Sequence, residues 1–386
     1  MKKILTLLIV LISAQQTQAK IWRINNNPSL SADLLQATNL FNNFTGVGDP
    51  EAAAGDTIYF EPSTSTYSGI SINKLNIVVI GYGYFLSDNP GLQVNANNSR
   101  VSSIEFLSTS TGSSMSGIEA TSSVYIDASN ITVTRCYLPT TYLYGFASNA
   151  SGIRIDKCYI NGNVAEQSIP PTITSVTIAV ENCIFAGLAD NNGVGGINLG
   201  QKVRGLCRNN TFNGANNMYC FNFYVANNIF VGNTNFGNVS QSGNNVFRNN
   251  LLAYNSNAQN SFVTNAAPNS GNVFAVNMAN VFVGPTNNTT NGTSIFNDFI
   301  NLPGFTKESR FDLKPGPHAA VAGGETGTTF SLATVTTPNC GSTGATDPYR
   351  KAGIPAIPTI YALTVPATIS NGASTMNISI SSRSNN

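Results

Sequence analysis

Charged residues are scarce in this chain of 386 residues. Only 10% of the residues are charged, and 19 Lys and Arg stand against 18 Asp and Glu. A surface with so little net charge has no field to attract nucleic acid, so we expect no nucleic-acid partner. The single histidine, His318, excludes a metal site built from several histidines and leaves no second histidine for catalysis. We therefore predict no metal site.

Asparagine is the residue in excess. The chain contains 53 Asn and 34 Gly, and 41% of its residues are apolar. Asn, Gly, Ser and Thr favour turns and extended chain, whereas the apolar fraction argues against global disorder. This composition predicts one long β-rich domain.

The N-terminus has the pattern of a secretory signal peptide. Lys2 and Lys3 precede an apolar run over residues 4–12, and small residues follow near Ala19. The run is too short to span a bilayer, and no later segment is long enough. We expect residues 1–19 to be removed and the mature chain to have no membrane span. The expected location is the periplasm, the outer membrane or the outside of the cell.

An eight-residue phrase recurs from about residue 130. Its sixth position, called the anchor, is Cys at 136, 158 and 183 and Asn at 210, 228 and 250. The positions three before and two after the anchor are apolar in all six copies. Apolar residues alternating before a bend are typical of a strand with one buried face. Such a short strand buries that face only by stacking on its neighbours.

The repeat therefore predicts an all-β fold, a parallel β-helix solenoid over residues 51–325. The anchors would form one internal column, in which Asn side chains hydrogen-bond along the axis and Cys fills the same space. Stacked Cys136, Cys158 and Cys183 would be thiols, since their geometry does not suit disulfides. Cys207 and Cys220 could pair. Phe185, Phe212 and Phe230, two after their anchors, should stack in the interior.

The two ends of the solenoid need covers, because an open end exposes strand edges. Residues 20–50 are predicted to form an N-terminal strand and a short capping helix from Ser31, its N-cap, to Phe41. Residues 326–386 are predicted to form a C-terminal cap and an irregular tail.

Several segments are similar to those of a known superfamily. They are Gly55-Asp-Thr-Ile-Tyr-Phe-Glu-Pro62, Gly81-Tyr-Gly83, Phe311-Asp-Leu-Lys-Pro-Gly316, Ala322-Gly-Gly324 and the repeated turns. Together they resemble the right-handed parallel β-helix proteins of the pectate-lyase-like superfamily, most of all exported envelope proteins of Bacteroidetes-type bacteria. The resemblance covers about residues 50–325 and implies a right-handed helix with a polysaccharide or envelope-protein partner. This scaffold carries lyases, hydrolases, adhesins and structural proteins alike.

The catalytic motifs of the enzymatic relatives are missing. No two Asp residues are adjacent, His318 is followed by Ala319, and the sequence Arg154-Ile155-Asp156 has Asp where those hydrolases have Lys. The chain is therefore more consistent with a protein that is not an enzyme. No cofactor is expected, and Ca²⁺ only if the chain is a lyase, because that cation needs several oxygen ligands.

One column of the repeat still offers catalytic candidates. Asp156 and Glu181, two before their anchors, should project outward on successive coils, with Arg208 on the next. A close carboxyl pair can supply a general acid and a base. The alternative, which we favour, is an exposed ion-pair ladder neutralised by Arg154, Lys157 and Arg208.

Tyrosines offer binding candidates. Tyr137 and Tyr159 follow their anchors directly and should point outward on neighbouring coils, beside Arg154. They could stack against sugar rings together with other tyrosines, namely Tyr142, Tyr144, Tyr219 and Tyr224. The alternative is that they shield strand backbones on a sheet face.

Two classes of function fit these observations. The first is an exported, non-catalytic β-helix protein that binds a glycan or a protein partner as a component of the bacterial cell envelope, or as an accessory part of a surface assembly. The second is a polysaccharide lyase or glycoside hydrolase with a divergent site on the β-helix face. We favour the first.

Overall fold

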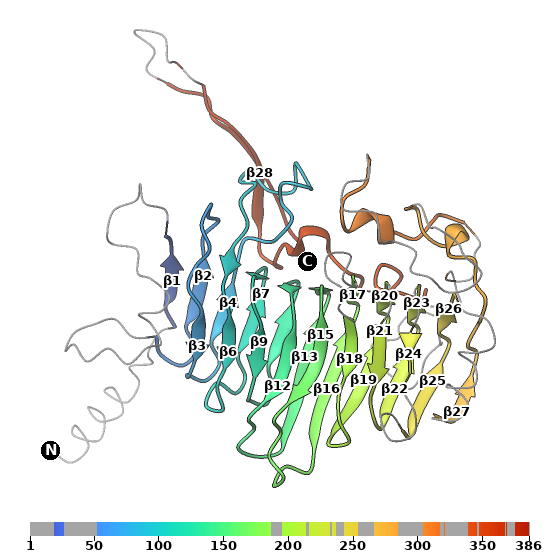
Figure 1. Cartoon of the computed structure of the whole chain (residues 1–386). Helices are drawn as coiled ribbons and strands as arrows, with labels where there is room; N and C mark the ends of the chain where they lie inside the picture. Colours follow the sequence, from blue (N-terminus) through green and yellow to red (C-terminus); the bar gives the residue numbers. More distant parts are fainter. Residues whose placement is uncertain are drawn as a thin grey trace, which may run out of the picture.

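The chain winds into a parallel β-helix with three sheets along its axis (Figure 1). The structure is a computed structural model, and it describes residues 19–26, 52–186, 195–213, 216–231, 234–236, 243–253, 266–284, 304–316, 320, 339–345, 347–366, 368 and 375–385. The predicted all-β solenoid is confirmed. The predicted signal peptide, except Ala19, and the predicted capping helix over residues 31–41 lie outside the described residues.

Each coil contributes strands to three parallel sheets, called A, B and C, which share one core. Sheet A has the strands β1 (Ile21–Ile24), β2 (Thr57–Phe60), β4 (Val78–Ile80), β7 (Ser114–Ser116), β10 (Thr132–Thr134), β13 (Ala150–Asp156), β16 (Val176–Glu181), β19 (Val203–Arg208), β22 (Phe223–Ala226), β25 (Asn245–Arg248) and β27 (Ala266–Ser270). Sheet B has the strands β5 (Arg100–Val101), β8 (Glu119–Ala120), β11 (Tyr137–Leu138), β14 (Tyr159–Ile160), β17 (Ile184–Phe185), β20 (Thr211–Phe212), β23 (Ile229–Phe230) and β26 (Leu251–Leu252). Sheet C has the strands β3 (Ile70–Ile72), β6 (Ile104–Phe106), β9 (Val124–Ile126), β12 (Thr141–Tyr144), β15 (Asn163–Gln167), β18 (Gly195–Asn198), β21 (Asn216–Tyr219) and β24 (Thr234–Asn235).

Outside the solenoid sheets, the described residues form three short 3-10 helices and one antiparallel hairpin. The helices are η1 (Met278–Asn280), η2 (Ser309–Phe311) and η3 (Lys351–Gly353), and the hairpin strands are β28 (Thr359–Thr364) and β29 (Ser379–Arg383).

A single left-handed residue makes the bend from sheet A to sheet B. The residue before each anchor has a φ between 51° and 59°, at positions 135, 157, 182, 209, 227 and 249. Asn adopts this left-handed backbone conformation more readily than most other residues with a side chain. It occupies four of these six positions. The bend turns the following anchor side chain into the interior.

The anchors form the predicted internal column. The side-chain oxygen of each Asn anchor accepts the backbone N–H of the anchor one coil earlier, in the pairs Asn210 to Cys183 (2.9 Å), Asn228 to Asn210 (2.9 Å) and Asn250 to Asn228 (3.0 Å). Asn272 continues the ladder by accepting from Asn250 at 3.0 Å. The three cysteine anchors are fully buried in the same column, and no disulfide joins any of the six cysteines, Cys207 and Cys220 included.

The predicted aromatic stack fills the core beside this ladder. Phe185, Phe212 and Phe230 are fully buried. Their ring centroids lie 4.4 Å and 4.8 Å apart along the axis, and neighbouring rings are nearly parallel. The repeat therefore predicted both the polar and the apolar columns of the interior.

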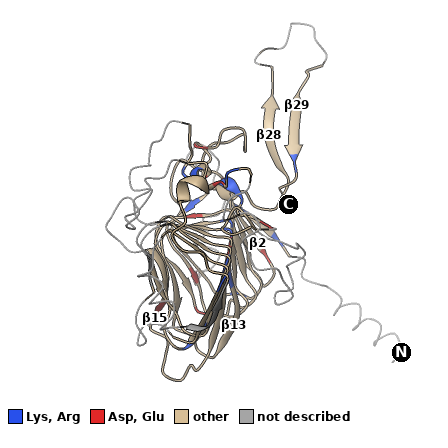
Figure 2. Cartoon of the chain, turned by 90° about the vertical axis from the view of Figure 1, so that its right-hand side faces the viewer, with Lys and Arg blue, Asp and Glu red and all other residues tan. Residues whose placement is uncertain are grey.

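A C-terminal segment, residues 339–345 and 347–354, lies against the outer face of sheet B and is called the strap. Five contacts mark its course from late coils to early ones: Gly341 with Asn227, Ser342 with Thr211, Asp347 with Lys157, Tyr349 with Tyr84, and Ile354 with Arg135. Its buried side chains join a second apolar cluster on the outside of sheet B. The tail was predicted to be irregular, but its described residues form this strap and the hairpin, which extends away from the solenoid (Figures 1 and 2).

Candidate functional site

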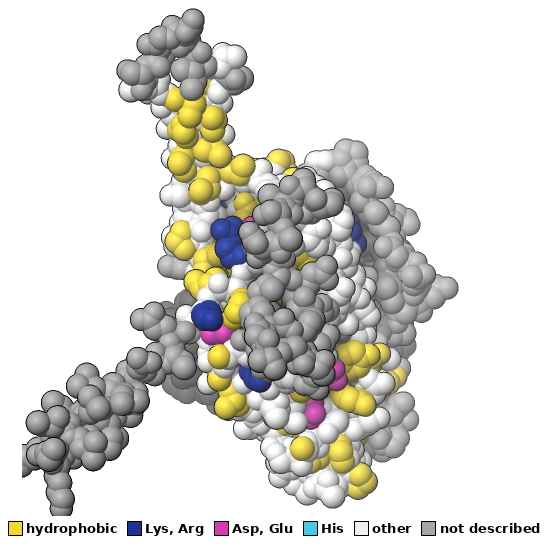
Figure 3. Space-filling view, turned by 90° about the vertical axis from the view of Figure 1, so that its left-hand side faces the viewer, with side chains coloured by type: hydrophobic (Ala, Val, Ile, Leu, Met, Phe, Trp, Pro, Cys, Tyr) yellow, Lys and Arg dark blue, Asp and Glu magenta, His cyan; other side chains and the backbone are white. Residues whose placement is uncertain are grey.

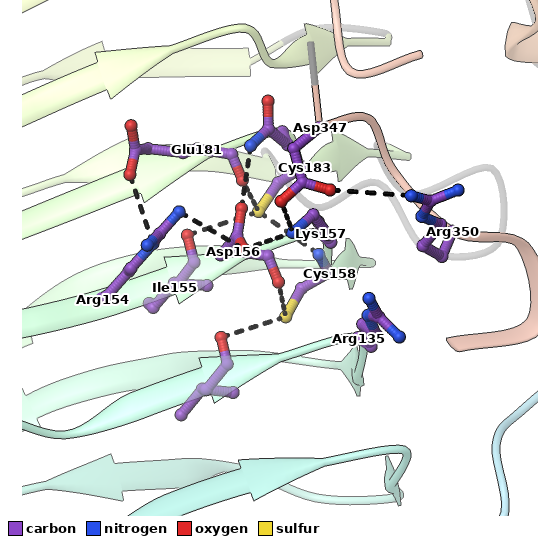
Figure 4. Close-up of polar contacts among 12 residues, drawn as sticks. Arg135, Arg154, Ile155, Asp156, Lys157, Cys158, Glu181, Cys183, Asp347 and Arg350 are labelled. Carbon is purple, nitrogen blue, oxygen red and sulfur yellow. Dashed lines mark hydrogen bonds and ion pairs between the residues drawn. The ribbon is translucent and has the colours of Figure 1, made fainter. Parts of the chain in front are cut away.

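The predicted carboxylate column exists, but its expected exposure is wrong. Asp156, Glu181 and Arg208 are register partners on β13, β16 and β19. Asp156 and Glu181 are each only 4% exposed. They lie at the end of sheet A, where the left-handed bend and the strap close over them (Figure 4). The sequence showed that they share a column, but not that another segment covers it.

Cations surround both carboxylates. Asp156 is paired with Lys157 at 3.1 Å and Arg154 at 3.5 Å, and it accepts a hydrogen bond from Asn182 at 2.9 Å. Glu181 is paired with Arg154 at 3.3 Å and contacts the Arg208 guanidinium.

Lys157 also binds the strap residue Asp347 at 2.5 Å (Figure 4). The Asp347 side chain is 63% exposed, so the pair that is buried on both sides is Lys157 with Asp156, and breaking a buried pair is far more costly than breaking an exposed one. The column therefore joins neighbouring coils to each other and to the strap.

The predicted tyrosine pair forms but is covered. Tyr137 and Tyr159 stack with centroids 5.8 Å apart. Tyr159 is only 3% exposed, because Phe85 packs edge-on against both rings and Arg310 donates to the Tyr159 hydroxyl at 3.3 Å. Both rings lie on the outer side of sheet B, but segments distant in sequence cover them there, so Tyr159 is buried and Tyr137 is half-buried. Arg154, the third binding candidate, pairs with the buried carboxylates.

Three other tyrosines lie on the outer face of sheet C. Tyr125 of β9 and Tyr142 of β12 are register partners, with ring centroids 5.4 Å apart. Tyr144 of β12 packs edge-on against Tyr125 at 5.9 Å and is 39% exposed. Residues two apart in a strand share a face, so Tyr142 and Tyr144 point to the same side. We call Tyr125, Tyr142 and Tyr144 the tyrosine face.

Two carboxylates adjoin the tyrosine face. Glu105 of β6 is the register partner of Tyr125 and accepts a hydrogen bond from Ser71 at 2.9 Å. Asp127 follows Tyr125 by two positions, which places it on the same face. Burial, and secondarily the charge of Glu105, raise the pKa of the Asp127 carboxyl to about 6. Among the described residues, Asp127 Oδ1 is shielded from solvent and has no hydrogen-bond partner.

The tyrosine face and its two neighbouring carboxyl groups can bind a polyol. An aromatic ring offers an apolar face, and a carboxyl group beside it can accept or donate hydrogen bonds to hydroxyl groups. Sequence reasoning named Tyr142 and Tyr144 but missed Tyr125, Glu105 and Asp127. The alternation Val124-Tyr-Ile126 before Thr141-Tyr-Leu-Tyr144 was the available signal. It lies outside the repeated phrase, so the alignment of the repeat does not include it.

Another buried carboxyl lies beneath the strap. Glu308 is 1% exposed and accepts hydrogen bonds from the Tyr349 hydroxyl, from Ala352 N at 2.9 Å and from Asn89 Nδ2 at 2.9 Å. Burial raises the pKa of this carboxyl to about 7. Because two of its partners lie on the strap and the third, Asn89, lies on a distant segment, Glu308 helps to hold the strap in place.

Within the described ranges, no group of three or more His, Cys, Asp or Glu side chains is placed to hold a metal ion. The same part of the chain contains no helix that is both long enough and apolar enough to cross a membrane.

No protein-family model matches the sequence, and no curated protein matches it. The candidate site therefore stands on the geometry of the tyrosine face alone.

Proposed function

We propose that the chain is an exported β-helix protein that binds a polysaccharide on the tyrosine face of sheet C, as a binding or structural component of a bacterial cell envelope. One observation carries the proposal: three tyrosine rings from neighbouring coils pack together on an outer face, beside two carboxylates.

Tyr144 is the residue best placed to contact a sugar. It is the most exposed of the three, and its ring is turned 72° from the ring of Tyr125. Edge-on packing of this kind holds an aromatic ring in a fixed orientation. A fixed ring loses little side-chain entropy on binding, which favours affinity. Asp127 and Glu105 would then form hydrogen bonds with hydroxyl groups at the edge of the stacked sugar.

Export and an envelope location rest on the sequence. The N-terminal pattern is that of a signal peptide, and the repeated phrases resemble those of exported envelope proteins. A rigid solenoid presents equivalent positions on successive coils, and this suits the repeating units of a glycan chain.

A panel of neutral and acidic polysaccharides tests this function, with binding measured by affinity electrophoresis and calorimetry. Tyr144→Ala should weaken binding at least about tenfold, whereas Tyr144→Phe should retain most of it because the ring remains. Tyr361→Ala is the matched control, since Tyr361 is also 39% exposed but lies on the hairpin. Equal affinities for Tyr144→Ala and the control would refute the proposed site, as would no binding to any polysaccharide.

Glycoside hydrolysis is the second candidate, and the raised pKa of Asp127 favours it. A carboxyl group with a pKa near 6, beside a second carboxylate, is the pairing that a general acid and its partner require. In this case the wild type releases reducing ends from the bound polysaccharide, and Asp127→Asn stops release while binding persists. Binding without release would leave the non-catalytic function.

A further inference from the structure

We propose that the β28–β29 hairpin is a self-association surface, which packs against the same hairpin of a second copy of this chain. The hairpin extends away from the solenoid, and a row of apolar side chains follows its length (Figure 3). This inference does not depend on glycan binding.

The register of the hairpin gathers apolar residues on one face. Leu363 and Ile380 are direct cross-strand partners. Val365 and Ile378, each two positions away from one of that pair, share their face. The neighbouring pair, Thr364 with Ser379, points to the opposite face. The four residues Leu363, Val365, Ile378 and Ile380, called the apolar face, are between 48% and 60% exposed.

The base of the hairpin is fixed to the solenoid. Arg383 donates to the Leu92 carbonyl at 2.7 Å, and Val94 N donates to the Ile360 carbonyl at 3.3 Å. Beyond this base, the two strands pair with no other strand in the described part of the chain. A two-stranded hairpin is only marginally stable in water by itself, and three or more strands or a packed face are needed.

The charge of the hairpin indicates the partner. No Lys, Arg, Asp, Glu or His occurs between Ala352 and Ser382. An acidic or basic peptide would find no countercharge on this face. Apart from Arg383 at its base, the hairpin lacks the charged edge residues that normally prevent strand addition. An uncharged apolar face matches an identical face across a two-fold axis, because such an interface uses the same patch on both copies.

The available area agrees with a weak dimer. Ile360 and Met376, which are 44% and 40% exposed, extend the apolar surface at the two ends of the hairpin. Burying these six side chains would remove roughly 500 Å² from each copy, or about 1,000 Å² in total, which is near the lower limit for a specific interface. We therefore expect a dissociation constant in the micromolar range.

Analytical ultracentrifugation of the whole chain across about 1–200 µM tests the proposal. We expect a reversible monomer–dimer equilibrium that the double substitution Leu363→Ser and Ile380→Ser weakens at least about tenfold. Leu75→Ser is the matched control, since Leu75 is 49% exposed on the solenoid, and it should leave the equilibrium unchanged. Far-UV circular dichroism checks that each variant keeps the solenoid.

Cysteine cross-linking gives an independent readout. All six native cysteines are buried, so Ile378→Cys would add the accessible thiol. It should form covalent dimers under mild oxidation, whereas Leu75→Cys should not. The proposal would be overturned by any of three results. The chain could be a monomer at all concentrations, or the double variant and the control could dimerise equally. The hairpin could also bind lipid vesicles in place of a second copy.

Discussion

Removing one rung of the asparagine ladder should destabilise the solenoid strongly. The Asn228 side chain is fully buried and makes two pairs of hydrogen bonds. Its oxygen accepts from the backbone N–H and the side-chain amide of Asn210, and its nitrogen donates to the Cys207 carbonyl and to Asn250. Asn228→Ala leaves two buried backbone groups without these partners, the N–H of Asn210 and the carbonyl of Cys207.

Each buried backbone group left without a partner costs about 1–3 kcal/mol. We therefore expect Asn228→Ala to lower the free energy of unfolding by about 4 kcal/mol. Urea denaturation followed by circular dichroism measures the loss, and hydrogen exchange localises it to the coils around Asn228, since a solenoid can open locally. Asn280→Ala, at an exposed position, is the control and should change stability by less than about 0.5 kcal/mol.

The column itself supplies an intermediate variant. Cys183 occupies the same position one coil before Asn210, where its thiol donates to the Glu181 carbonyl at 3.1 Å and lies 3.4 Å from the backbone N–H of Cys158. Asn228→Cys should therefore recover part of the lost stability. A loss below about 1 kcal/mol for Asn228→Ala, or no difference between the two variants, would refute the reasoning.

Three further perturbations test other parts of the structure. Phe212→Ala should cost about 3–5 kcal/mol as a cavity between stacked rings, and a loss below about 1 kcal/mol on urea denaturation would contradict this. The pKa of Glu308 rises from 4.5 to about 7 on folding, so its stabilisation is complete below about pH 4.5 and is lost as the pH rises through 7. Relative to Glu308→Gln, the wild type should lose up to about 3 kcal/mol between pH 5 and 8, and parallel stability profiles would contradict this. The double substitution Asp156→Asn with Glu181→Gln should lower stability but leave glycan binding intact. If binding assays show that this variant no longer binds the glycan, the two carboxylates belong to the binding site.

The interior of the solenoid was predictable because it repeats. The anchor recurs at the same place in every copy of the phrase, so alignment alone placed Asn210 and Asn228 in one column and Phe212 on the core side of the next strand. Hydrogen bonds between successive anchors and apolar stacking between coils are local consequences of this repeat.

The outer surface was not predictable, because it depends on contacts between distant segments. Lys157 binds Asp347, which lies 190 positions away in the sequence, and nothing in the repeat indicates that the strap returns to this coil. The same strap and its neighbours bury Asp156 and Tyr159, which an isolated coil would expose. The full tyrosine face was not predictable for another reason: Tyr125 precedes the regular phrases, so only the register of sheet C places it beside Tyr142.

Hydrogen exchange with and without bound polysaccharide tests the central claim most directly. If the tyrosine face is the binding site, the polysaccharide should slow exchange in β9 and β12, around residues 124–127 and 141–144, and leave β28 and β29 unchanged. Protection confined to sheet A, to the strap or to the hairpin, or no protection by a polysaccharide that binds, would contradict the account.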